Sequence, residues 1–124
     1  MTDFKTLLDN AVYAAVLAKV GNTQRSQIEQ LISKINERAD DLEGVLYFEA
    51  FLMRQASKGN VDHRFARKVI EVCNMLNNDR SKIREFLGLL KWSFETVDRM
   101  GRVNAREFER NGFDMLKRKF LGGR

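Results

Sequence analysis

The sequence predicts an all-α fold, a single-domain bundle of five to six helices. The chain has 124 residues, of which 44% are hydrophobic, so one domain can build a core without disulfide or metal support. It contains no proline, although average usage predicts about six in a chain of this length. Apolar residues recur at three- and four-residue steps, and no segment alternates with a period of two. We therefore expect residues 1–124 to form one helical domain.

The first helix is expected from about Asp3 to Val20. Its apolar side carries Phe4, Leu7, Leu8, Ala11, Ala15 and Ala18. Gly21 and Asn22 both tolerate a left-handed backbone, so we expect the helix to stop there. Thr23 is expected to cap a second helix, because a threonine hydroxyl can accept a hydrogen bond from an unpaired N–H of the first turn. The apolar stripe of this second helix is Ile28, Leu31, Ile32 and Ile35.

Asp40 and Glu43 have the spacing of a capping box, which predicts the start of a third helix that ends near Ser57. Its apolar surface is wide, which indicates burial on more than one face. That surface comprises Leu42, Val45, Leu46, Tyr47, Phe48, Phe51, Leu52, Met53 and Ala56. Gly59 breaks this helix, and Asp62 is expected to cap a fourth. The fourth helix carries Phe65, Val69, Ile70, Cys73 and Leu76.

A turn at residues 77–79 leads to a fifth helix that ends near Val97. Its apolar side carries Ile83, Phe86, Leu87, Leu90, Phe94 and Val97. Asn104 and Glu107 repeat the capping-box spacing after Gly101. They predict a last helix over about 104–120, whose apolar residues are Phe108, Phe113, Met115, Leu116 and Phe120.

The inventory of reactive residues argues against an enzyme, and we expect no cofactor and no metal. Cys73 is the single cysteine and His63 the single histidine, so neither a disulfide nor a zinc ligand set can form within the chain. Without a disulfide, a cytoplasmic location is expected. The longest apolar run covers Ala14 to Ala18, far below the roughly 20 residues of a membrane helix, so we expect no membrane partner.

The net charge of +5 is concentrated in the last part of the chain. Residues 101–124 carry seven basic and three acidic side chains, whereas the first 100 residues are nearly balanced. Arg102, Arg106 and Arg110 recur every four residues, which predicts a row on one helix surface. Such a row can neutralise successive phosphates of a nucleic acid. The basic surface continues through Lys117, Arg118 and Lys119.

A second basic group consists of Arg64, Arg67 and Lys68. Arg54 and Lys58 are expected nearby, across the turn at Gly59. The alternative for both groups is that cations near a helix C-terminus complement its dipole and keep the surface solvated. We treat phosphate binding as the hypothesis and charge compensation as its rival.

Two further side chains have competing interpretations. Cys73 falls on an apolar stripe, which favours a small buried hydrophobe. Trp92 follows Lys91 in the sequence, and an exposed indole in a basic setting can stack on a nucleobase. A core or interface role for Trp92 is the favoured interpretation.

Three segments together resemble a known family. They are SQIEQLISKIN (residues 26–36), YFEAFLMRQASKG (residues 47–59) and FARKVIEVCNMLNNDRSKIREFLGLLKWSF (residues 65–94). In this order and spacing they resemble the small helical subunit of type III CRISPR RNA-guided effector complexes, the III-A form especially. The resemblance covers roughly residues 23–97, so the basic C-terminal part lies outside it.

The resemblance implies a non-catalytic protein that stacks in several copies beside the other CRISPR effector subunits. It implies contact with the phosphates of guide RNA and target RNA, without reading of sequence, in antiviral defence. The residues that would make these contacts are Arg25, Arg54, Lys58, Arg64, Arg67 and Lys68. Glu29 stands where the family tends to have an arginine, which argues against an RNA contact at that position.

The rival hypothesis is a helical protein–protein adaptor with no nucleic-acid role. In it, the aromatic residues Tyr47, Phe48, Phe51 and Trp92 form a docking surface. Salt distinguishes the two, because phosphate-driven binding weakens steeply as salt rises and apolar docking does not.

Overall fold

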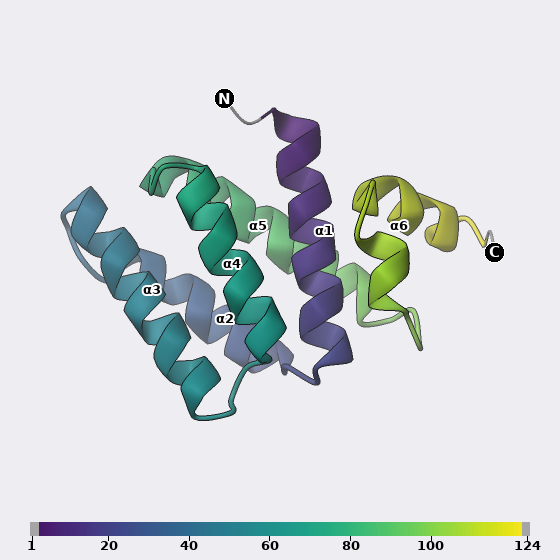
Figure 1. Ribbon diagram of the computed structural model, residues 1–124, viewed down its shortest axis with the longest axis horizontal. Coiled ribbons are helices and arrows are strands. Elements are labelled where there is room, and N and C mark those ends of the chain that lie inside the picture. The colour runs from purple at the N-terminus through teal and green to yellow at the C-terminus, as the bar shows by residue number, and fades with distance from the viewer. Residues whose placement is uncertain (1–2, 123–124) are drawn as a thin grey trace.

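A computed structural model describes residues 3–122, which contain six α-helices, two 3₁₀ turns and no strand (Figure 1). The helices are α1 (Phe4–Val20), α2 (Arg25–Ser33), α3 (Asp41–Ser57), α4 (His63–Met75), α5 (Arg80–Val97) and α6 (Gly112–Phe120). The 3₁₀ turns are η1 (Lys34–Asn36) and η2 (Ala105–Phe108). The expected all-α, single-domain bundle is confirmed.

α1 is the central helix of the bundle. Every residue from Ala14 to Ala18 is buried, so this helix is enclosed on all sides rather than along one stripe. It packs on α4, α5, α6 and η2. In Figure 1, α1 lies between α4 and α6, with α5 crossing behind it. α1 therefore holds the C-terminal segment against the rest of the molecule.

The helix starts depend on side-chain caps, most of them at the expected residues. The carboxylates of Asp40 and Asp62 accept hydrogen bonds from the backbone N–H groups of Glu43 and Phe65, both at 2.9 Å. Each such cap satisfies one of the N–H groups that the first turn leaves unpaired.

The expected cap at Thr23 is wrong, because Gln24 is the N-cap of α2. Gln24 and Gln27 form a reciprocal capping box there. Thr23 is buried, and its Oγ1 accepts a hydrogen bond from the backbone N–H of Asp62 at 2.8 Å. The hydroxyl therefore ties the α1–α2 turn to the start of α4 and does not cap its own helix.

The chain reverses at the expected turns, and Asn22, but not Gly21, is left-handed after α1. Asn22 has a φ of 63° and Gly59 a φ of 78°, and Asn77 and Asn78 both have positive φ between α4 and α5. Because asparagine and glycine tolerate this conformation, the chain reverses at these positions with little strain.

The expected continuous helix over 104–120 is wrong. The Asn104 side chain accepts a hydrogen bond from the N–H of Arg106 at 2.9 Å, and this cap starts only the 3₁₀ turn η2. Asn111 then adopts a left-handed φ of 52° before α6 begins. Phe108 at the end of η2 is fully buried, so the break lets this side chain reach the core.

Among the described helices, none combines the length and the apolar character needed to cross a membrane.

Candidate nucleic-acid interface

Basic side chains from two distant parts of the sequence meet beside the C-terminal half of α1. Arg64, Arg67 and Lys68 come from α4, whereas Arg102 and Arg106 come from the segment around η2. Both elements pack on α1, and in Figure 1 the yellow-green C-terminal segment lies across α1 from α4. We call the surface made by these five residues the basic face.

Two open hollows adjoin on the basic face, and Arg64 lines both of them. The larger, about 660 Å³, is lined by Val20, Arg64, Arg102, Val103, Asn104, Ala105, Arg106 and Glu107. The smaller, about 170 Å³, is lined by Tyr13, Leu17, Arg64, Arg67, Lys68 and Glu71. The lining of the hollows therefore combines basic side chains with apolar side chains of α1.

The basic groups of this face are largely uncompensated. In residues 3–122, no acidic group lies within ion-pair distance of Arg67, Arg102 or Arg106. The ion pair of Arg64 is long, with its Nε 3.9 Å from a carboxylate oxygen of Asp62. Lys68 places its Nζ 5.6 Å from the centre of the Tyr13 ring, a cation–π contact. These cations remain available to an anionic ligand.

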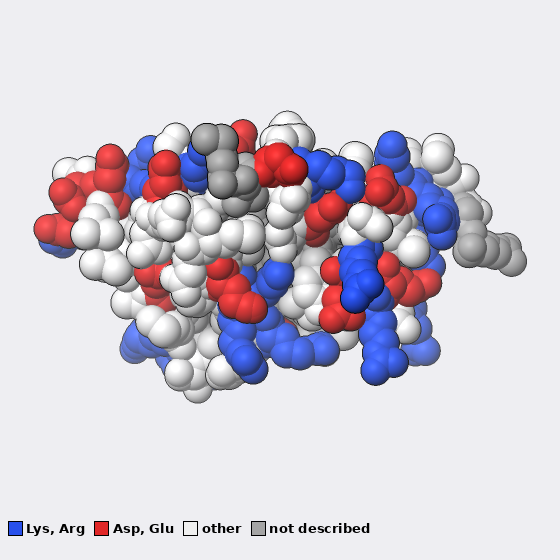
Figure 2. Space-filling view, turned by 45° about the horizontal axis from the view of Figure 1, so that its top comes forward, with Lys and Arg blue, Asp and Glu red and all other residues white. Residues whose placement is uncertain are grey.

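Acidic side chains are few around the two hollows. In the face shown in Figure 2, lysine and arginine lie along both the upper and the lower edge, with acidic side chains among them. Within the two hollows, by contrast, only Glu71 and Glu107 are acidic, beside the five cations of the basic face. This local excess of positive charge focuses the field toward an anionic partner.

The predicted row of Arg102, Arg106 and Arg110 does not lie on one helix. Arg102 precedes η2, Arg106 lies in it, and Arg110 follows it in the bend before α6. The four-residue spacing places side chains on one surface only in a continuous helix. Arg102 and Arg106 nevertheless share the larger hollow, while Arg110 lines neither.

The three basic residues of α6 lie outside the basic face. Lys119 pairs with Glu107 at 3.3 Å. Lys117 lies with its Nζ 5.6 Å from the centre of the Phe113 ring, and Arg118 is exposed. All three are in the last turn of α6, where cations complement the helix dipole.

Three residues assigned by the resemblance also lie elsewhere. Arg25 at the start of α2 is engaged by acidic side chains, at 2.6 Å from Glu95 and 3.5 Å from Glu29. Arg54 and Lys58 are exposed at the end of α3 and line neither hollow. Of the six residues, the structure brings Arg64, Arg67 and Lys68 together.

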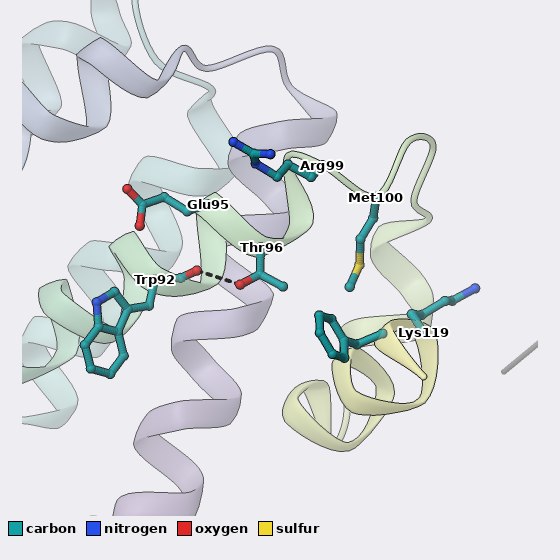
Figure 3. A pocket seen from close by; sticks show the side chains of 7 residues that line it. Trp92, Glu95, Thr96, Arg99, Met100 and Lys119 are labelled. Atoms are coloured by element: carbon teal, nitrogen blue, oxygen red, sulfur yellow. Dashed lines mark hydrogen bonds between the residues drawn. The ribbon is translucent and has the colours of Figure 1, made fainter. Parts of the chain in front are cut away.

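Trp92 is not a core residue, because 72% of its surface is exposed. It lines an open hollow of about 670 Å³ between α5 and the C-terminal segment. We call it the aromatic hollow; its lining is Trp92, Glu95, Thr96, Arg99, Met100, Lys119 and Phe120. Figure 3 shows Trp92, Glu95 and Thr96 along α5, with Lys119 on the other side. Phe120, one of the apolar residues of the predicted last helix, is 74% exposed.

The docking surface expected for an adaptor is only partly present. Phe48 is fully buried and Phe51 is half-buried, since α3 turns these rings toward the core. Tyr47 and Trp92 are exposed, but they lie on different helices, α3 and α5.

The single cysteine and the single histidine of the chain lie in different surroundings. Burial, and to a smaller extent the charge of Glu49, raises the pKa of the Cys73 thiol to about 12, so this thiol is not a nucleophile at neutral pH. His63 is exposed in the first turn of α4. Within residues 3–122 no three His, Cys, Asp or Glu side chains cluster as metal ligands would.

Comparison of the chain with protein-family models, with curated proteins and with solved structures found no match.

Proposed function

We propose that the chain is a non-catalytic subunit of a cytoplasmic type III CRISPR ribonucleoprotein effector in antiviral defence. In this role it assembles in several copies with other effector subunits and binds the phosphate backbone of guide or target RNA through the basic face.

One observation carries the RNA-binding part of the proposal. Five basic side chains gather around two adjoining hollows. In the sequence they are up to 42 positions apart, from Arg64 to Arg106. Charge compensation at a helix terminus does not account for this grouping, because Arg64, Arg67 and Lys68 lie in the first half of α4. A surface on which several cations lack an acidic partner favours contact with backbone phosphates.

The assignment to a CRISPR effector is supported by the resemblance over roughly residues 23–97. Its test is purification of the tagged protein from its native cells, with identification of the proteins and RNA that accompany it. We expect a large ribonucleoprotein with short, uniform guide RNAs. Recovery of one or two proteins without RNA would contradict the assignment.

The basic face is tested by reversing two of its charges. We predict that the double variant Arg64→Glu/Arg102→Glu binds RNA roughly tenfold or more weakly at low salt, because two phosphate contacts become repulsive. Binding is measured by the fluorescence anisotropy of labelled RNA, and circular dichroism checks that helicity is unchanged.

The matched control is Arg110→Glu/Arg118→Glu, which changes the net charge by the same amount outside the basic face. We expect the RNA affinity of this control to fall less than about threefold, because only the long-range field changes. Equal losses in the two double variants would show that only total charge matters, and the basic face would then not be the binding surface.

A further inference from the structure

Two large aromatic side chains at the aromatic hollow are exposed to solvent, which is unusual for rings of this size. Trp92 is 72% and Phe120 74% exposed. Aromatic rings gain most from burial, and exposed rings that share one hollow commonly mark a binding surface. The volume of about 670 Å³ is within the range of sites for small organic groups and exceeds that of one side chain.

The charge of the hollow selects an anionic occupant. Its carboxylate, Glu95, is neutralised by Arg25 at 2.6 Å. Of its two cations, Lys119 pairs with Glu107 at 3.3 Å. Arg99 is exposed and has no acidic group within ion-pair distance in residues 3–122. One uncompensated guanidinium therefore lies beside two exposed rings.

One short segment of chain connects the aromatic hollow to the basic face, and the Lys119–Glu107 ion pair links their linings. Arg99 and Met100 line the aromatic hollow, and Arg102 and Arg106 line the larger hollow of the basic face. A polyanion that follows residues 99–106 would meet both surfaces. This connection favours one extended ligand over two unrelated ones.

We propose that the aromatic hollow binds an unpaired nucleotide of single-stranded RNA. The base packs against both Trp92 and Phe120, since every base offers a π-face to an aromatic ring, and a neighbouring phosphate pairs with Arg99. Paired bases in a duplex hide these faces, so the hollow discriminates single-stranded from double-stranded RNA. The inference rests on the proposed RNA-binding function, but it assigns a separate site and a separate ligand state.

Trp92 is the single tryptophan of the chain, so tryptophan emission reports on this site alone. The experiment titrates the full chain at low salt with a short oligouridylate, and separately with an RNA duplex of the same length. Anisotropy of a dye on the RNA measures binding independently of the tryptophan. We expect both RNAs to bind and only the oligouridylate to quench Trp92 emission.

Variants separate stacking from general charge. Phe120→Ala and Arg99→Gln should each weaken oligouridylate binding about fivefold or more and change duplex binding less than about twofold. Phe4→Ala is the matched control, because it removes a ring that is 56% exposed on α1, outside the hollow. It should leave both affinities unchanged.

Each contrary result has a distinct meaning. Oligouridylate binding without quenching, or without loss in Phe120→Ala, would overturn the inference while leaving phosphate binding by the basic face intact. Failure of both RNAs to bind would overturn the proposed function together with it. A third outcome would assign the hollow to a second copy of the chain instead. In that case Trp92 emission shifts with protein concentration in the absence of RNA, and Trp92→Ala loses self-association but keeps RNA binding.

Discussion

Arg80 shows how one residue can hold a loop that has little regular structure. Its side chain is 7% exposed, and its guanidinium donates to the carbonyl oxygens of Ile35, Arg38 and Ala39 at 2.6–3.1 Å. It also pairs with the Asp41 carboxylate at 2.9 Å. A buried charge is tolerated only when its hydrogen bonds are satisfied, and here the backbone between η1 and α3 satisfies them.

Gly44 makes the space for this guanidinium. A Cβ at position 44 would overlap the Arg80 side chain, although Gly44 lies inside α3, where glycine is unfavourable. We predict that Gly44→Ala lowers the free energy of unfolding by about 1–3 kcal/mol, despite the better helix propensity of alanine. Urea denaturation followed by circular dichroism measures the change.

The matched control is Gly88→Ala in α5, where an added Cβ meets nothing within 4 Å. We expect it to stabilise the fold by about 0.5–1 kcal/mol, through propensity alone. In an Arg80→Ala background, Gly44→Ala should also become neutral or stabilising, because the overlap is gone. Destabilisation of the same size in both backgrounds would show that the guanidinium is not the reason for the glycine.

Charge and spacing alone could not predict that Arg80 is buried. Arg80 follows Asp79, the cap of α5, and from the sequence it looks like an ordinary first-turn cation. Its burial depends on the carbonyl groups of residues 35–39, which tertiary structure brings to it. Cys73, by contrast, was predicted correctly as buried, since its neighbours on the helix stripe are apolar.

At the scale of elements, α6 is held in place by a residue of α1. The Asp9 side chain accepts a hydrogen bond from the N–H of Phe113 at 3.0 Å, in the first turn of α6. Lys5 pairs with Asp9 at 2.9 Å and with Asp114 at 3.3 Å. Gly112 completes the contact, because an added Cβ would come within 3.0 Å of the Asp9 carbonyl oxygen.

We predict that Asp9→Ala loosens α6 selectively. Loss of the cap should lower stability by about 1 kcal/mol, as for other N-cap replacements. Amide hydrogen exchange should speed up in residues 112–120 more than in α5. Asp9→Asn is the control: its side-chain oxygen can still accept from Phe113, so α6 should keep most of its protection. Equal loosening of α5 in Asp9→Ala would point to general destabilisation instead.

This tertiary cap explains why the C-terminal segment was predicted less well than the other helices. The local pattern at Asn104 and Glu107 is a helix start, and η2 does begin there. The chain then breaks at Asn111 because Phe108 enters the core and Asp9 caps a new helix. Asp9 lies 104 residues before Phe113 in the sequence, so no local pattern reveals this cap. Of the other five helices, α2 ends at Ser33 and passes into η1, short of the predicted Ile35, while the remaining four end near local signals. The existence of all five and most of their bounds were therefore predictable.

At the scale of the whole molecule, packing regroups basic residues that the sequence places in two separate groups. The sequence separated Arg64, Arg67 and Lys68 from Arg102 and Arg106, and only the packing of α4 and η2 on α1 unites them. The same packing places Arg110 outside the basic face. Spacing predicts which residues share one face of a helix. It does not predict that two elements distant in sequence pack side by side on a third.

The arrangement predicts how RNA binding responds to salt. Each phosphate neutralised on a single strand adds about −0.7 to the slope of log K against log salt. If each residue of the basic face and Arg99 meet one phosphate each, we expect a slope of about −4 for oligouridylate, measured by anisotropy over a series of KCl concentrations. Arg64→Gln/Arg102→Gln should reduce it to about −3, whereas Arg110→Gln/Arg118→Gln should leave it unchanged. A slope near zero would favour apolar docking and the adaptor hypothesis. Equal reductions of the slope in the two double variants would show that phosphate contacts also lie outside the basic face.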